Sequence, residues 1–289
     1  HGSSEVCPSE RPAVDWRRTA GHVYEADGAI WFRSTTFGDD KDRVIVRSNG
    51  QPTYFASDLG YIAQKFSRGF DELIYLWGED HHGTVARNRA AARALGFDPA
   101  SVHWLLIAWV RFVRDGVEIG MSKRSGEFIS LDGLLAEIGA DAARWYFGSR
   151  ATSTGIDLDI ELAKRQSAEN PVYYVQYAHA RCSSILRKAA ESDLAPDAQN
   201  ASVLLIHAAE QALLRRLLAL PEVVADAADR RETHELTHYC RELAQLFSAV
   251  SRACRVPPDE QSEVPPSQGR AALTAAPGPG PPQARRHAA

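Results

Sequence analysis

The sequence has a single methionine, Met121, and it begins with His1. We therefore expect these 289 residues to belong to a longer protein. No apolar run approaches the roughly 20 residues that cross a membrane, and no signal peptide opens the chain. Four cysteines are scattered and form neither a CxxC pair nor a disulfide framework: Cys7, Cys182, Cys240 and Cys254. These absences favour a cytoplasmic protein without a membrane partner.

An excess of positive charge is also missing, because the formal net charge is -4 at pH 7. The chain as a whole does not attract nucleic acid, so any RNA contact must come from a local basic face. A length of 289 residues allows about two domains. The hydrophobic content of 44% is ordinary for a folded globular protein.

The first half of the chain carries strand and helix signals in alternation. Residues 29–34 and 43–48 alternate apolar and polar side chains, which predicts two half-buried strands. Asn49 and Gly50 then form a dipeptide typical of tight turns. Ser57 and Asp58 predict a helix start, because the apolar residues that follow recur at helical spacing. Residues 1–28 carry little periodicity and are left unassigned.

The stretch 71–83, DELIYLWGEDHHG, organises the rest of this half. Its apolar run 73–77 predicts a buried strand that ends abruptly in glycine, acidic and histidine residues. Open parallel sheets present such groups to ligands at the carboxyl ends of their strands. Gly78 and Gly83 allow backbone or ligand to approach closely.

The adjacent histidines, His81 and His82, have two readings. One is a pair that caps a helix or satisfies the core, and the other is a zinc site. Adjacent histidines point apart on a strand, and no cysteine or third histidine lies at the usual ligand separation. We therefore expect no metal bound by the protein itself.

A second polar segment follows the long apolar run 103–113, which predicts another buried strand. Residues 121–124, MSKR, lie in a loop that contains small hydroxyl and glycine residues. An ammonium group on such a loop suits a triphosphate, because it neutralises charge that develops during attack on phosphorus. A solvated basic loop is the plainer alternative.

The second half is predicted to be helical. Residues 131–150 indicate a helix interrupted near Gly139, and strand signals disappear from Asp157 onward. Asn170 and Pro171 suit the start of a further helix. Residues 256–289 are rich in proline, glycine and alanine, which predicts disorder. A shifted reading frame in GC-rich DNA is another source of such a composition.

The stretch 71–83, with YFASDLGY upstream and MSKR about forty residues beyond, resembles the catalytic domain of arginyl-tRNA synthetases, a class I aminoacyl-tRNA synthetase family. MSKR resembles the KMSKS signature, although Gly120 stands in place of its first lysine. The HIGH signature is absent, so we expect the chain to begin after it. The resemblance implies an α/β fold: the C-terminal half of a Rossmann-type catalytic domain (1–160), an α-helical anticodon-binding bundle (161–255) and the tail (256–289).

The resemblance implies ATP-dependent activation of L-arginine and transfer of the arginyl group to tRNA(Arg), with Mg2+ accompanying ATP. For arginine it implies binding by Tyr54, Asp58 and His81. For ATP it implies Gly78 and Asp80 at the adenosine side, and Lys123 with Met121 and Ser122 at the phosphates. For tRNA it implies contacts with Tyr174, Gln176, Tyr177 and Arg181.

Other readings remain open. Asp58 taken alone suits a helix cap, and the tyrosines of 173–177 suit bundle packing. The loss of HIGH beside an intact helical bundle also allows a tRNA-binding remnant without catalysis. A further alternative is another class I ligase such as a cysteinyl enzyme, although that enzyme uses a zinc site for which we find no residues in this sequence. We expect a monomer.

Overall fold

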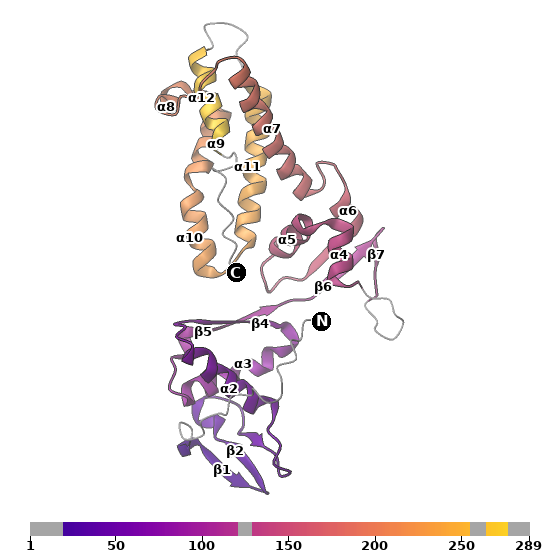
Figure 1. Ribbon diagram of the computed structural model, residues 1–289, viewed down its shortest axis with the longest axis vertical. Coiled ribbons are helices and arrows are strands. Elements are labelled where there is room, and N and C mark those ends of the chain that lie inside the picture. The colour runs from indigo at the N-terminus through magenta and orange to yellow at the C-terminus, as the bar shows by residue number, and fades with distance from the viewer. Residues whose placement is uncertain (1–19, 121–128, 255–263, 277–289) are drawn as a thin grey trace. The chain divides into compact units, whose positions relative to one another are not determined.

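The protein divides into two compact units, residues 1–109 and 110–289, in a computed structural model that describes residues 20–120, 129–254 and 264–276 (Figure 1). This division precedes the domain boundary expected near residue 160, which stays a prediction. The reason is that Phe112 and Leu158 share a hydrophobic core with Val172 from the helical part, so the intervening region belongs with the helices. None of the described helices is long and apolar enough to cross a membrane.

The first unit opens with an antiparallel sheet of β1 (Val23–Ala26), β2 (Ala29–Phe32) and β3 (Arg43–Val46). The two strands expected from alternation are confirmed, and β1 falls in the stretch that was left unassigned. The turn expected at Asn49 and Gly50 is also confirmed, with Gly50 at φ 79° and its N–H donated to the Arg47 carbonyl over 2.8 Å.

Helix α2 (Tyr54–Ser67) begins earlier than Ser57, which corrects the expected start. Thr53 is the N-cap, because its hydroxyl accepts a hydrogen bond from the Ala56 N–H over 3.3 Å. A β-branched threonine that ends an extended segment competes well for this position. Asp58 therefore lies inside the helix and is not its cap.

Strand β4 (Leu73–Gly78) pairs in parallel with β5 (Val102–Ile107), from Leu73 beside Val102 to Gly78 beside Ile107. This confirms the expected strand, but only one of its faces is buried, since Ile74 and Leu76 are 49% and 65% exposed. The connection runs through η4 (Glu79–His81), α3 (His82–Ala94) and η5 (Pro99–Ser101). Side chains from α2, α3 and both strands form one core, including Leu59, Ile62, Leu73, Ala91 and Val102.

The apolar run 103–113 is not one strand, which corrects a second expectation. It breaks at Ala108 and Trp109, and β6 (Val110–Arg114) belongs to the second unit. There β6 pairs with β7 (Val117–Glu118) and, in parallel, with β8 (Ile156–Asp159). Strand β8 was not expected after Asp157, because four residues are too few for an alternation signal.

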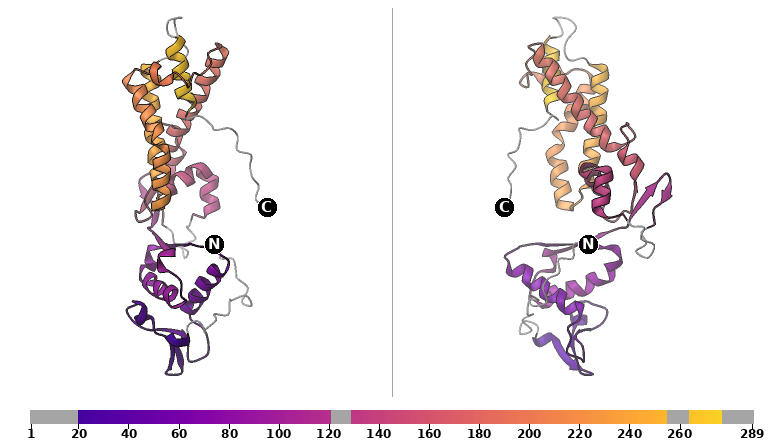
Figure 2. Two further views of the ribbon diagram at one scale, coloured as in Figure 1. Left: turned by 90° about the vertical axis from the view of Figure 1, so that its left-hand side faces the viewer. Right: turned by 45° about the vertical axis from the view of Figure 1, so that its right-hand side comes forward.

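Helices α4 (Leu131–Ile138) and α5 (Ala140–Gly148) confirm the expected interruption, where Gly139 has φ 81°. After the short α6 (Ile160–Lys164), α7 (Pro171–Glu191) begins with Pro171 in its first turn as expected, and Asn170 is its N-cap. The bundle continues with α8 (Ala201–Leu204), α9 (Ala208–Leu218), α10 (Leu220–Arg230) and α11 (His234–Ala253). Helix α11 packs against α7 and α9 (Figures 1 and 2).

Helix α12 (Val264–Ala275) corrects the expectation of disorder throughout 256–289. Ala271 and Leu273 are buried, and α12 packs on α7 and α8. Arg270 donates from Nε to Oε1 of Glu210 over 2.6 Å, and Glu210 is fully buried in α9. Composition misled here because a segment rich in proline, glycine and alanine can still form a helix when a bundle supplies the apolar surface.

We expect Arg270→Met to destabilise the bundle, because it leaves the buried Glu210 carboxylate without its cation. Breaking a buried pair from one side costs about 3 to 5 kcal/mol. Chemical denaturation followed by circular dichroism measures the loss. Arg252→Met is the matched control, since Arg252 is exposed on α11 and should change the free energy of unfolding by less than about 0.5 kcal/mol. Equal effects of both variants would contradict a structural role for the ion pair.

Candidate functional site

Asp58 occupies the second turn of α2, half-buried against α3. Burial raises the pKa of its carboxyl group, and this rise is partly offset by a hydrogen bond from the Asn88 side chain and by the charges of Arg87 and His81. Asp58 makes no ion pair within 4.0 Å with any described residue. Its carboxylate therefore keeps acceptor capacity for a ligand.

Aromatic rings from β4 and β5 lie beside Asp58. Tyr75 is buried, and its pKa is raised by burial and by the nearby Tyr61 and Asp58. The Tyr75 hydroxyl has no hydrogen-bond partner among the described residues. The Trp77 and Trp104 rings lie 5.6 and 5.9 Å from the Tyr75 ring. Cations of the chain already lie over two of these rings, Lys65 Nζ at 3.9 Å from the Tyr75 centroid and Arg89 Cζ at 5.6 Å from the Trp104 centroid. Asp58 thus lies near Tyr75, whose hydroxyl keeps an unused donor.

The polar residues that follow β4 gather at its carboxyl end, as expected. Gly78 has an extended backbone and precedes η4, and a Cβ built on it would come within 2.5 Å of Oδ1 of Asp80. His81 lies 3.7 Å from Asp80, and its ring centroid is 6.1 Å from that of Trp77. His81 and His82 are both exposed, so neither satisfies the core.

The structure thus brings His81 near Asp58, while Tyr54 lies one turn before Asp58 with 88% of its surface exposed. Gly78 and Asp80 lie at the end of the neighbouring strand. Met121, Ser122 and Lys123 lie outside the described residues, so their expected approach to this site stays a prediction.

The four residues expected to contact tRNA all lie on α7 but differ in exposure. Tyr174 is half-buried against the bundle core, and its hydroxyl lies 3.3 Å from Oγ of Ser248. Gln176, Tyr177 and Arg181 are exposed. Tyr177 also stacks on Tyr173 with ring centroids 6.1 Å apart. Bundle packing therefore accounts for Tyr174 and does not account for Tyr177.

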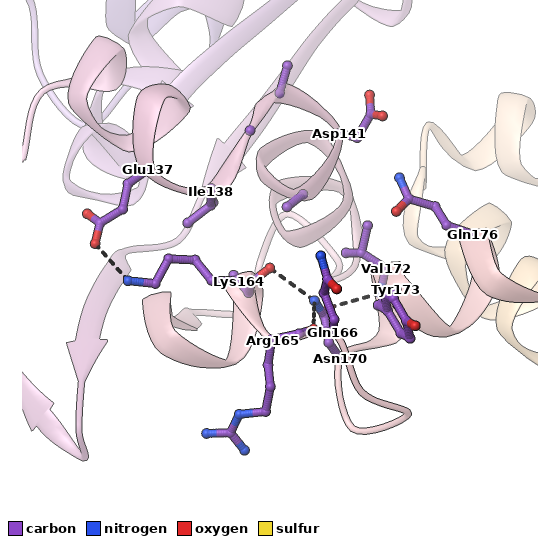
Figure 3. Close-up of a pocket in the computed structure, with 14 residues that line it drawn as sticks. Glu137, Ile138, Asp141, Lys164, Arg165, Gln166, Asn170, Val172, Tyr173 and Gln176 are labelled. Carbon is purple, nitrogen blue, oxygen red and sulfur yellow. Dashed lines mark hydrogen bonds and ion pairs between the residues drawn. The ribbon is translucent and has the colours of Figure 1, made fainter.

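A cavity of about 620 Å³ opens beside Gln176 and Tyr173, between α4, α5, α6 and α7 (Figure 3). The buried Asn170, which lines this cavity, donates from its side-chain amide to the carbonyls of Ala163 and Arg165 over 3.0 and 2.9 Å. These bonds hold the segment between α6 and α7 in place. The cations of its rim are already paired: Lys164 with Glu137 and Glu161, and Arg165 with Glu169. Little positive charge is left for an anionic ligand here.

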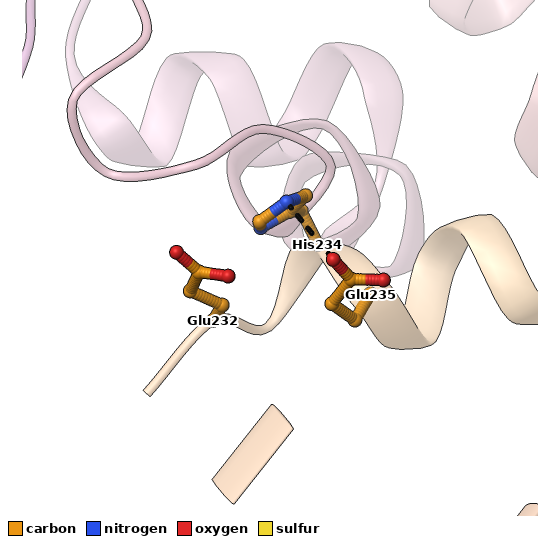
Figure 4. A group of neighbouring side chains, drawn as sticks. All are labelled: Glu232, His234 and Glu235. Carbon is orange, nitrogen blue, oxygen red and sulfur yellow. Dashed lines mark ion pairs between the residues drawn. The ribbon is translucent and has the colours of Figure 1, made fainter. Parts of the chain in front are cut away.

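Glu232, His234 and Glu235 place their ligand atoms within 4.8 Å of one another at the start of α11 (Figure 4). The spacing His-Glu-x-x-His over residues 234–238 is a metal signal that our reading of the sequence overlooked. His238 does not join the group, although its ring lies 5.5 Å from that of His234. Acidic residues at a helix N-terminus are favoured by the helix dipole without any metal.

Two family models match the chain. The model for the catalytic domain of class I tRNA synthetases of the arginine type matches residues 2–147, and the model for the DALR anticodon binding domain matches residues 175–277. The chain belongs to the arginyl-tRNA synthetase family. This membership supports the expected fold class and argues against a cysteinyl enzyme. It also accounts for α12, because the second model reaches beyond that helix.

Arginyl-tRNA synthetases from several bacteria are similar along most of the chain. The arginine–tRNA ligase of Heliobacterium modesticaldum is 48% identical over 84% of this chain and 44% of its own length. That of Frankia alni is 46% identical over 91% of this chain and 48% of its own length. The chain therefore spans less than half the length of these relatives.

Solved structures of arginyl-tRNA synthetases are also similar to this chain. A putative arginyl-tRNA synthetase from Campylobacter jejuni superposes with a TM-score of 0.76 at 30% identity, covering 90% of this chain and 57% of that one. The Thermus thermophilus arginyl-tRNA synthetase has a TM-score of 0.71 at 23% identity, covering 92% and 56%. The latter identity supports the fold alone.

We expect Asp58→Asn to keep or raise the stability of the chain at neutral pH. A carboxyl group whose pKa is higher in the folded state disfavours folding once it ionises, so its removal helps above the folded-state pKa. The difference should vanish below about pH 4, where the unfolded aspartate is also protonated. Thermal melts from pH 3 to 8 test this. Asp71→Asn, exposed before β4, is the matched control and should show no such pH-dependent gain.

Proposed function

We propose that the protein containing this chain is an arginine–tRNA ligase, which activates L-arginine with ATP and Mg2+ and transfers it to tRNA(Arg). The observation that carries the proposal is the half-buried Asp58, which makes no ion pair with a described residue and lies near the Tyr75 ring of β4. A guanidinium is a permanent planar cation that binds a carboxylate and stacks on aromatic rings. Such a site suits an arginine side chain.

We assign Tyr54, Asp58 and His81 to the arginine substrate. Tyr54 and Asp58 are four residues apart on α2 and so share one face of the helix. Gly78 and Asp80 are assigned to the adenosine side, because they end a parallel strand where open α/β sheets bind nucleotides. Glycine at position 78 leaves room for the Asp80 carboxylate, because a Cβ there would come within 2.5 Å of Oδ1.

The proposed chemistry has two displacements. An oxygen of the arginine carboxylate attacks the α-phosphorus of ATP, the bond to the β-phosphate oxygen breaks, and pyrophosphate leaves. A terminal ribose hydroxyl of tRNA then attacks the arginyl carbonyl carbon, and AMP leaves with the mixed-anhydride oxygen. Positioning and stabilisation of phosphate charge supply the catalysis, with no protein nucleophile. Lys123, with Met121 and Ser122, is assigned to the phosphates.

A tRNA-binding remnant without catalysis is the second candidate, supported by the match of the helical bundle to the DALR anticodon binding domain. Exchange of labelled pyrophosphate into ATP, with arginine and tRNA present, separates the two. Exchange that depends on arginine supports the ligase. Binding of tRNA without exchange by the full-length protein supports the remnant. A cytoplasmic location and a monomeric state remain predictions.

We expect Lys123→Ala in the full-length protein to lower the rate of pyrophosphate exchange by about a hundredfold or more, as when a donor to developing oxyanion charge is removed. Arginine affinity, measured by equilibrium dialysis, should change little because Lys123 acts on the phosphates. Lys41→Ala, exposed before β3, is the control and should leave both values unchanged. Equal losses of exchange and arginine affinity would remove Lys123 from the proposed role.

We expect Tyr177→Ala to weaken tRNA binding by roughly tenfold, because stacking of a base on an aromatic ring contributes about 1 to 3 kcal/mol. Tyr177→Phe keeps the ring and should retain most of the affinity. Fluorescence anisotropy with labelled tRNA(Arg) measures both. Tyr61→Ala, on the exposed face of α2 in the first unit, controls for loss of a tyrosine elsewhere. If Tyr177→Phe loses as much affinity as Tyr177→Ala, stacking is not the contribution of this residue.

A further inference from the structure

A second cavity of the helical unit, of about 350 Å³, lies between the end of α5, the start of β8, the start of α7 and α11. A smaller one of about 210 Å³ shares Pro171 and Arg241 with it and continues toward Gln245. Residues 237, 238, 241 and 245 of α11 follow helical spacing and line the two cavities in turn. We call these two adjoining cavities the α11 groove.

The groove carries positive charge without local compensation. Arg150 and Arg241 are exposed and make no ion pair or hydrogen bond within the described part of the chain. His238 lies between Thr237 and Arg241 along the same wall and adds an imidazole N–H donor. In the Figure 3 cavity, by contrast, the rim cations are bound to carboxylates.

The acidic residues of the groove are neutralised from outside it. Asp157 is bound by Arg111 through two hydrogen bonds of 2.6 and 2.8 Å, which lower the pKa of its carboxyl group. Glu169 is bound by Arg165 over 2.7 Å. Neither Arg111 nor Arg165 is among the lining residues. The two groove arginines therefore set the sign of its potential.

Neutral groups of the groove also lack partners. Tyr146 is buried with 9% of its surface exposed, and its hydroxyl makes no hydrogen bond to a described residue. Burial raises the pKa of Tyr146 to about 12, so the hydroxyl keeps its proton and remains a donor. Trp145 supplies a half-buried aromatic surface in the same wall. This buried donor without a protein partner is available to a water molecule or to a polar ligand.

We propose that the α11 groove binds the sugar–phosphate backbone of an RNA, with Arg150 and Arg241 contacting phosphates. Guanidinium forks match phosphate oxygens, and an elongated groove suits a chain of phosphates better than a single small anion. Backbone contacts position an RNA without reading its sequence. The identification of that RNA as tRNA rests on the proposed function, whereas the phosphate chemistry of the groove does not.

The test measures binding of the 289-residue chain to two labelled transcripts, tRNA(Arg) and an unrelated tRNA, by anisotropy at several KCl concentrations. We expect Arg150→Ala with Arg241→Ala to weaken both complexes by roughly tenfold and to reduce the salt dependence by about one counterion for each lost phosphate contact. The double lysine variant should keep most of the salt dependence. Arg230→Ala with Arg252→Ala, two exposed arginines outside the groove, is the matched control.

An unchanged affinity and salt dependence in the double alanine variant would overturn the proposal. So would a loss confined to one transcript, an equal loss in the control pair, or a chain that binds neither RNA. If inorganic phosphate binding is lost while RNA affinity is kept, the groove is a site for free phosphate and the proposal fails. Absence of arginine-dependent pyrophosphate exchange, with the RNA effects as expected, would refute the ligase and leave the groove intact.

Discussion

Parallel pairing of β4 with β5 is the constraint on which the candidate site depends. Two parallel neighbours need a crossover, and here η4 and α3 supply it. The crossover must leave β4 at its carboxyl end, which puts Gly78, Asp80 and His81 there. Helix α2 packs on α3 and brings Asp58 to the same neighbourhood. A single ladder of backbone hydrogen bonds thus positions groups from three segments.

In the second unit, some cations are paired with carboxylates and others are not. Around the sheet of β6, β7 and β8, cations and carboxylates form a network: Arg111 with Asp157, Arg114 with Glu137, and Lys164 with Glu161. Exposed pairs of this kind contribute little to stability individually. Their effect on recognition is larger, because they cancel charge on one side and leave Arg150 and Arg241 uncancelled on another. A chain with net charge -4 thereby keeps a local basic surface.

Much of the fold was accessible from the sequence where one local pattern dominates. The strand before Gly78, the interruption at Gly139 and the helix start at Pro171 are each set by neighbouring residues, and all were predicted. The predictions were wrong where the neighbouring residues in the sequence do not determine the local structure. Helix α2 is capped by Thr53 and does not begin at Ser57. The apolar run 103–113 is divided between the two units, and β8 is too short to show an alternating pattern.

The candidate sites follow the same division. The family motifs located Asp58, Asp80 and His81 because they lie close to distinctive sequence strings. The α11 groove has no comparable sequence motif, because its walls come from four segments and its two arginines are almost a hundred positions apart. No window of sequence contains Arg150 and Arg241 together. Only the packing of α5, α7 and α11 makes neighbours of these segments.

Glu210 receives its counter-charge from a residue 60 positions further along the chain. During synthesis the carboxylate of α9 must therefore remain accessible to water until Arg270 has left the ribosome. The buried charge of α9 is thus satisfied only when the last described helix is in place.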